Sequence, residues 1–105
     1  VDMLLTTTEQ VMGREYDIFG LVKGATIQSK NIGRDFGAGL KSIVGGELTG
    51  YTEMMEEARD IAMQRMEEEA KRLGADGIVG IRFSTSAIMQ GAAEVMAYGT
   101  AVKFK

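Results

Sequence analysis

The side chains that most often perform chemistry in proteins are largely missing from this sequence. Its 105 residues include no Cys and no His. This excludes disulfides, thiolate or imidazole metal ligands and Ser-His catalytic triads. The hydroxyls of Ser and Thr have no imidazole to activate them, and nothing marks a Lys-assisted serine. No catalytic constellation is recognised, so the balance is against an enzyme.

Carboxylates are the remaining groups that could hold a metal ion. Glu53, Glu57 and Asp60 share one face of a predicted helix, and such a set could bind a hard cation. Glu67 to Glu69 are consecutive, so their side chains point in different directions around a helix. A solvated helix surface explains both groups more simply. A carboxylate metal site is therefore the alternative hypothesis, and no metal ligand is assigned.

A glycine-rich segment and a methionine group also invite a functional interpretation. Residues 37–42 superficially resemble a phosphate-binding loop, but they lack the G-x-x-x-x-G-K spacing and fall inside a predicted helix. Met54, Met55, Met63 and Met66 recur at helical spacing, which is more typical of a hydrophobic core than of copper ligation. Neither feature defines a binding site.

The charge balance limits the partners that the chain can have. The formal net charge is −3, and the calculated isoelectric point is about 4.9. This argues against general binding of nucleic acid or of anionic membranes, which both require a basic surface. No signal peptide is visible, and no apolar run approaches the roughly 20 residues of a membrane span. We therefore expect a cytoplasmic protein.

The apolar pattern predicts three main strands and a short N-terminal strand. Their ranges are 3–8, 16–28, 78–84 and 92–104, with residues 85–91 connecting the last two as a hairpin. In the second strand, Gly20 and Gly24 fall on one face together with Ile18, and they mark a bend or a close neighbour.

Two helices are predicted, at residues 31–44 and 49–73, from apolar stripes at helical spacing. Each glycine inside a helix costs about 1 kcal/mol relative to Ala, so the glycines of the first helix need a reason, such as the close approach of another backbone. They are Gly33, Gly37 and Gly39. Gly45 and Gly46 end the first helix, and Gly74 follows the second as its C-cap.

The last strand lacks a solvent-facing side of the usual polar kind. Residues 95–102 carry no charge. One face carries Val95, Ala97 and Ala101, and the other carries Met96, Tyr98 and Val102. Two helices can cover only one face of a small sheet, so the second face needs a neighbouring subunit. The alternative is that the short strand and the loops shield it. We expect a homo-oligomer.

Blocks of sequence spread over nearly the whole chain follow one family pattern. They are Gly24–Ile27, Asn31–Gly39, Ile43–Gly46, Ala58–Ala62, Leu73–Ile81 and Tyr98–Val102. In this order they resemble the YbjQ-like family of small, uncharacterised bacterial proteins. The resemblance implies a single α+β domain over residues 3–105, similar to a dodecin subunit, with two layers: an antiparallel sheet and two helices. It also implies a ring-shaped homo-oligomer, a pentamer.

The family also carries a heavy-metal-binding label, which these residues fit badly. Soft metals prefer thiolate and imidazole ligands, and the chain has neither. The matched glycines and aspartates could instead serve fold and assembly, with Asp35 and Asp76 as caps or intersubunit hydrogen-bond partners. The candidate fold or assembly residues are Gly33, Asp35, Gly37, Gly45, Gly46, Gly74, Asp76, Met96, Tyr98 and Val102. The functional hypothesis is a small ligand bound between subunits, with no cofactor identified.

Overall fold

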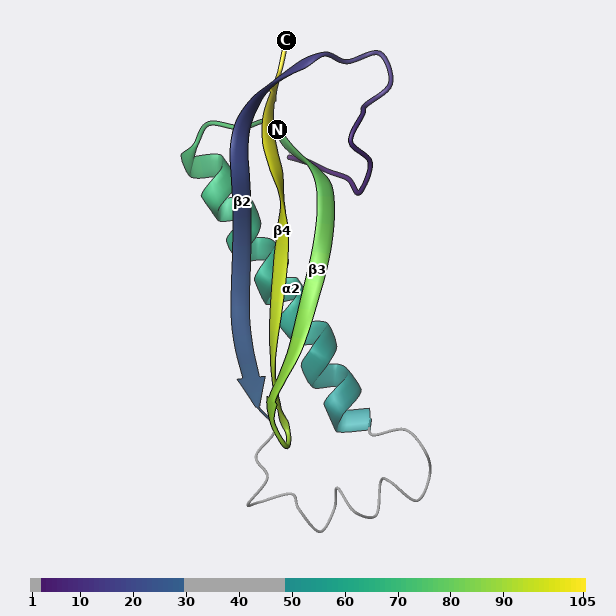
Figure 1. Ribbon diagram of the computed structural model, residues 1–105, viewed down its shortest axis with the longest axis vertical. Coiled ribbons are helices and arrows are strands. Elements are labelled where there is room, and N and C mark those ends of the chain that lie inside the picture. The colour runs from purple at the N-terminus through teal and green to yellow at the C-terminus, as the bar shows by residue number, and fades with distance from the viewer. Residues whose placement is uncertain (1–2, 30–48) are drawn as a thin grey trace.

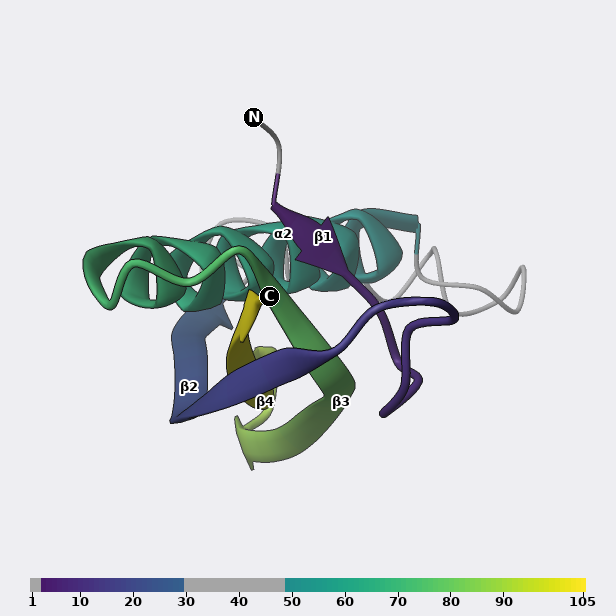
Figure 2. The ribbon, with the colours of Figure 1, turned by 90° about the horizontal axis from the view of Figure 1, so that it is seen from above.

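The computed structural model describes residues 3–29 and 49–105 of the chain. Its elements are β1 (Leu4–Leu5), β2 (Tyr16–Ser29), α2 (Thr49–Arg72), β3 (Gly77–Met89) and β4 (Ala92–Phe104). The strands form one sheet of order β1-β3-β4-β2, and α2 crosses one face of it diagonally (Figures 1 and 2). This confirms the α+β class and the three main strands with a short N-terminal one. The helix predicted at residues 31–44 lies outside the described residues.

β1 makes the sheet mixed, so the prediction of a wholly antiparallel sheet is wrong. Leu4 pairs with Gly77 and Leu5 with Ile78 in parallel. Residues 6–15 then carry the chain from this edge of the sheet round to β2 at the opposite edge (Figure 1). Composition and alternation indicate that a segment is extended, but they do not give the direction in which a two-residue strand pairs.

A β-bulge changes the predicted faces at the start of β2. Ile18 pairs with Val102, whereas Gly20 pairs with Ala101, so Phe19 is the extra residue. Gly20 has a φ of 128° and no neighbour where a Cβ would lie. Because Val102 and Ala101 face opposite sides of β4, Ile18 and Gly20 also face opposite sides. The prediction that they share a face is wrong, while the predicted bend at Gly20 is confirmed.

The β3–β4 hairpin is longer than predicted. β3 continues to Met89, which pairs with Ala92, so only Gln90 and Gly91 form the turn. Gly91 has a φ of 77°, a conformation that favours glycine in a tight turn. Residues 85–89 escaped prediction because both faces of this end of β3 are exposed, so no apolar alternation marks it.

The helix α2 packs its small and flexible apolar residues against β2 and β4. Its buried stripe is Met54, Ala58, Ala62, Met66 and Ala70. The prediction of residues 49–73 is confirmed to within one residue. A Cβ built on Gly24 would lie 2.3 Å from the Ala62 oxygen and from the Met66 nitrogen. Gly24 therefore allows the helix backbone to lie directly on β2. The close neighbour predicted at Gly24 is the backbone of α2.

The end of α2 has the geometry of a Schellman cap. Gly74 adopts a φ of 81°. Its backbone N–H donates to the Lys71 oxygen at 3.0 Å, and the Ala75 N–H donates to the Ala70 oxygen at 3.1 Å. These two bonds satisfy carbonyl groups that have no partner inside the helix. The predicted C-cap at Gly74 is confirmed.

The hydrophobic core lies between α2 and the sheet, with fully buried Val22, Met66, Ile78 and Val95 among its members.

The helix α2 is 24 residues long. None of the helices in the described part of the chain has both the length and the apolar character needed to cross a membrane.

Candidate functional site

The sheet face opposite α2, which we call the open face, has no described helix on it (Figure 2). Leu21 and Ile27 of β2 lie on this face and are 67% and 62% exposed. They pair with Thr100 and Glu94 of β4, between which half-buried Met96 and Tyr98 occupy the same face. Lys23, opposite Tyr98, is the cation of β2 here. The open face is therefore an apolar strip with a polar margin.

Val102 does not belong to this exposed strip, although the sequence placed it there. It lies at the bulged end of the sheet, where it pairs with Ile18 of β2 and Gly77 of β3, and it is fully buried within the single chain. The expectation that Val102 would need a neighbouring subunit is wrong. The alternation along β4 predicted correctly on which side of the sheet Val102 lies. It did not predict that Val102 is buried, because burial there depends on the neighbouring ends of β2 and β3.

The distal half of β3 is a second exposed surface, which the sequence pattern did not predict. β1 pairs only with Gly77 and Ile78, and the residues from Arg82 to Met89 are all exposed. Phe83, Ile88 and Met89 are 43%, 48% and 67% exposed. A helix about 10 Å wide covers roughly two strands at a spacing of about 4.8 Å, which leaves the distal half of β3 outside its reach. Ile88 and Met89 lie in the segment predicted as a loop, and these apolar residues were the signal that could have indicated this surface.

Asp76 joins the beginning of β3 to the end of β4 inside the subunit. Its Oδ1 accepts a hydrogen bond from Lys103 Nζ at 3.2 Å, and its Oδ2 accepts one from the Phe104 N–H at 3.1 Å. The hydrogen bond from Lys103 is the main cause that lowers the pKa of the Asp76 carboxyl below its usual value. Asp76 therefore stays ionised and fastens two strand ends.

The remaining candidates from the sequence cannot be placed. Gly33, Asp35, Gly37, Gly45 and Gly46 all lie outside the described residues.

The predicted carboxylate set does not form a metal centre. Glu53, Glu57 and Asp60 are exposed on the outer face of α2. In residues 3–29 and 49–105, no three or more acidic side chains gather closely enough to hold a metal ion. With no Cys or His in the chain, these residues do not fit a soft metal either.

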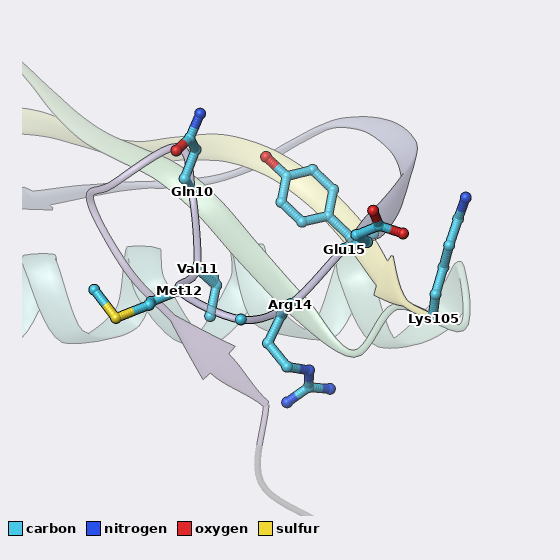
Figure 3. Close-up of a pocket in the computed structure, with 8 residues that line it drawn as sticks. Gln10, Val11, Met12, Arg14, Glu15 and Lys105 are labelled. Atoms are coloured by element: carbon cyan, nitrogen blue, oxygen red, sulfur yellow. The ribbon is translucent and has the colours of Figure 1, made fainter.

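A hollow of about 860 Å³ lies beside residues 10–16 and Lys105. Figure 3 shows that its labelled side chains diverge: Gln10, Met12, Arg14 and Lys105 point in different directions. Met12, at the tip of this loop, is 99% exposed. Because no polar groups converge in the hollow, it has no evident binding chemistry.

Arg14 also contacts β4, through the ring of Phe104. Its guanidinium carbon lies 4.2 Å from the centre of the Phe104 ring. Tyr16 contacts the same ring edge-on, with 6.3 Å between the ring centres, and its hydroxyl donates a hydrogen bond to the Glu9 carbonyl. These contacts anchor the crossing loop to the C-terminal end of β4.

The fold and its surfaces define a class: a small α+β domain in which, among the described residues, one helix packs on a long sheet whose other face is open and apolar. A family model described as "Putative heavy-metal-binding" matches residues 3–105, and the chain belongs to this YbjQ family.

Relatives named UPF0145 protein are similar over their whole length. The protein from Clostridium novyi is 63% identical over 101 residues, which are 96% of this chain and 98% of that protein. The protein from Thermotoga maritima is 56% identical over 104 residues, or 98% of each chain. A crystal structure from Pediococcus pentosaceus, titled as a protein of unknown function in the DUF74 family, has a TM-score of 0.65 at 20% identity and covers 98% of each chain. This last similarity shows the fold.

Proposed function

We propose that this protein works as a homo-oligomer whose subunits associate through the open face, and that a small ligand binds where subunits meet. The observation that carries the proposal is the exposure of Leu21 and Ile27 beside Met96 and Tyr98 on one sheet face. Removing apolar surface from water contributes about 25 cal/mol per Å², so contact between such faces favours association.

A ring of five subunits is the form that the family resemblance suggests. The two long edges of the sheet are different surfaces, because β2 forms one edge and the distal half of β3 extends beyond β1 at the other. Contacts between unlike surfaces generate rings when the rotation closes. The open face and the exposed end of β3 together supply such unlike surfaces.

The proposal includes no reaction and no metal. The carboxylate metal site was the alternative, and no described observation favours it over solvated acidic side chains. Titration calorimetry with zinc, copper, nickel and calcium tests this point directly. Saturable heat together with a metal-dependent rise in melting temperature would favour the alternative.

Light scattering coupled to size exclusion tests the assembly at micromolar concentration. We expect a mass that is a multiple of the 11.4 kDa chain. Leu21→Lys and Ile27→Lys place charge on the open face and should shift the mass toward a single subunit, with the helical circular dichroism retained. Gln64→Lys, on the exposed side of α2, is the matched control and should assemble normally. A wild-type mass of 11.4 kDa would overturn the proposal.

Native mass spectrometry of the assembly purified from cells tests the ligand. We expect a small molecule retained in the intact oligomer and lost when Leu21→Lys separates the subunits. Oligomers that carry no added mass would contradict ligand binding, while leaving the assembly itself supported.

A further inference from the structure

A separate hollow of about 600 Å³ lies where β1, the turn from α2 to β3 and the end of β4 meet. Met3, Leu4, Ala75 and Phe104 form an apolar wall, and the side chains of Arg14 and Lys71 supply two cations. All of these groups come from one subunit. The hollow is large enough for a small organic molecule, and its lining combines an apolar wall with charged groups of mainly one sign.

Arg14 is held in place while its donors stay free. Its guanidinium carbon lies over the Phe104 ring, 4.2 Å from the ring centre, so the ring restrains the position of the group. The guanidinium makes no hydrogen bond or ion pair with any residue that the structure describes. A guanidinium has its N–H donors in one plane, where they can form two parallel hydrogen bonds to a carboxylate or a phosphate.

The acid in this hollow, Asp76, offsets only part of the positive charge around it. Both oxygens of Asp76 are already engaged, by Lys103 Nζ at 3.2 Å and by the Phe104 N–H at 3.1 Å. Lys71, in the last turn of α2, has no ion pair within the described part of the chain. The charge of Asp76 is therefore balanced mainly by Lys103 and in part by the nearby charge of Arg14. Because Arg14, Lys71 and Lys103 carry three positive charges against the one of Asp76, positive charge remains available to an anion.

We propose that this hollow binds a small organic anion that has an apolar body. Arg14 binds the carboxylate or phosphate head through two hydrogen bonds, and Lys71 adds a second positive charge. The apolar body packs on Leu4 and Phe104. Because one subunit forms the whole site, binding here does not depend on the open face or on assembly.

Amide chemical-shift titrations of the isotope-labelled full chain test the proposal, with benzoate and phenyl phosphate as probes. We expect saturable shifts at Ala75 and Phe104 with at least one of these anions, which also identifies the preferred head group. Benzyl alcohol has a similar ring without the charge and should bind at least about tenfold more weakly. Equal binding of the alcohol, or no saturable shift at these residues, would overturn the proposal.

Substitutions separate a specific site from general electrostatics. Arg14→Gln should weaken anion binding by about tenfold or more, and Arg14→Lys should restore only part of it, because the charge returns without the planar pair of donors. Arg59→Gln removes the same charge from the exposed side of α2 and should bind like the wild type. If Arg14→Gln keeps a folded amide spectrum and binds benzoate and phenyl phosphate as the wild type does, the site is not at Arg14.

Discussion

At the scale of single residues, Gly24 marks the closest approach between α2 and the sheet. A methyl group added there would lie 2.3 Å from two backbone atoms of the helix, which cannot move aside like a flexible side chain. Gly74 offers a contrast, because it has a positive φ but nothing within 4 Å of an added Cβ.

We therefore expect Gly24→Ala to lower the free energy of unfolding by about 3 kcal/mol and Gly74→Ala by about 1 kcal/mol. The first change forces helix and sheet apart, whereas the second only strains the local backbone. Urea denaturation of both variants measures the difference. Equal losses would contradict the close packing of α2 on Gly24.

Asp76 should make stability depend on pH in the acid range. Its pKa is lowered in the folded protein, chiefly by the hydrogen bond from Lys103. The unfolded chain, with an ordinary Asp pKa of about 3.9, therefore binds a proton more readily. The contribution of Asp76 is present in full above that ordinary value and is lost as pH falls through the lowered folded value.

Unfolding measured from pH 7 to pH 2 tests this for the wild type and Asp76→Asn. The difference in unfolding free energy should be constant near neutral pH and shrink as the acid range is entered. A difference that does not change with pH would mean that the Asp76 carboxylate charge contributes nothing.

At the scale of elements, Arg65 fastens α2 to the edge strand β2. Its Nη1 donates to the Ala25 carbonyl at 2.7 Å, across 40 residues of sequence. Arg65→Gln should lower the free energy of unfolding by about 1 kcal/mol, because the exposed carbonyl can be rehydrated. Thermal denaturation checks this against Arg59→Gln.

Arg59 is exposed on the same helix and makes no comparable bond within the described residues, so its replacement should change stability by less than about 0.5 kcal/mol. If both variants behave alike, the contact from Arg65 to Ala25 does not stabilise the packing of α2 on β2.

The elements also show why some predictions from sequence failed. Alternation located β2, an uncharged apolar run located β4, and helical periodicity located α2, because each buries one face along most of its length. Residues 85–89 of β3 bury neither face, so they carry no such pattern and were predicted to be part of a loop. The bulge at Phe19 shifts the alternation by one residue, which period-based analysis cannot detect.

At the scale of the whole molecule, the strands exceed what one helix can cover. β2 has 14 residues and β3 and β4 have 13 each, against about 5–6 in a typical strand. In the described part of the chain, α2 alone packs on the sheet, and it protects one face, mainly that of β2 and β4. The exposed apolar residues on the open face are the consequence, and they are the basis of the proposed assembly.

Assembly predicts that thermal stability depends on concentration. If subunits separate as they unfold, the melting temperature of the wild type should rise over about a hundredfold range of protein concentration. Differential scanning measurements check this, with Leu21→Lys as the control that should show a smaller dependence. A wild-type melting temperature independent of concentration would argue for a stable single subunit.

The sequence by itself determined the elements that bury one face, the Gly74 cap, the absence of thiol and imidazole chemistry, and the family. These follow from residue types and short-range periodicity, which do not require knowledge of distant neighbours.

Only the tertiary structure decided the parallel pairing of β1, the burial of Val102 and the meeting of Arg14 with Phe104, which are 90 positions apart in the numbering. Such contacts arise where strand ends, a crossing loop and a helix end converge. Their energies depend on distances in space, which the order of residues along the chain does not specify.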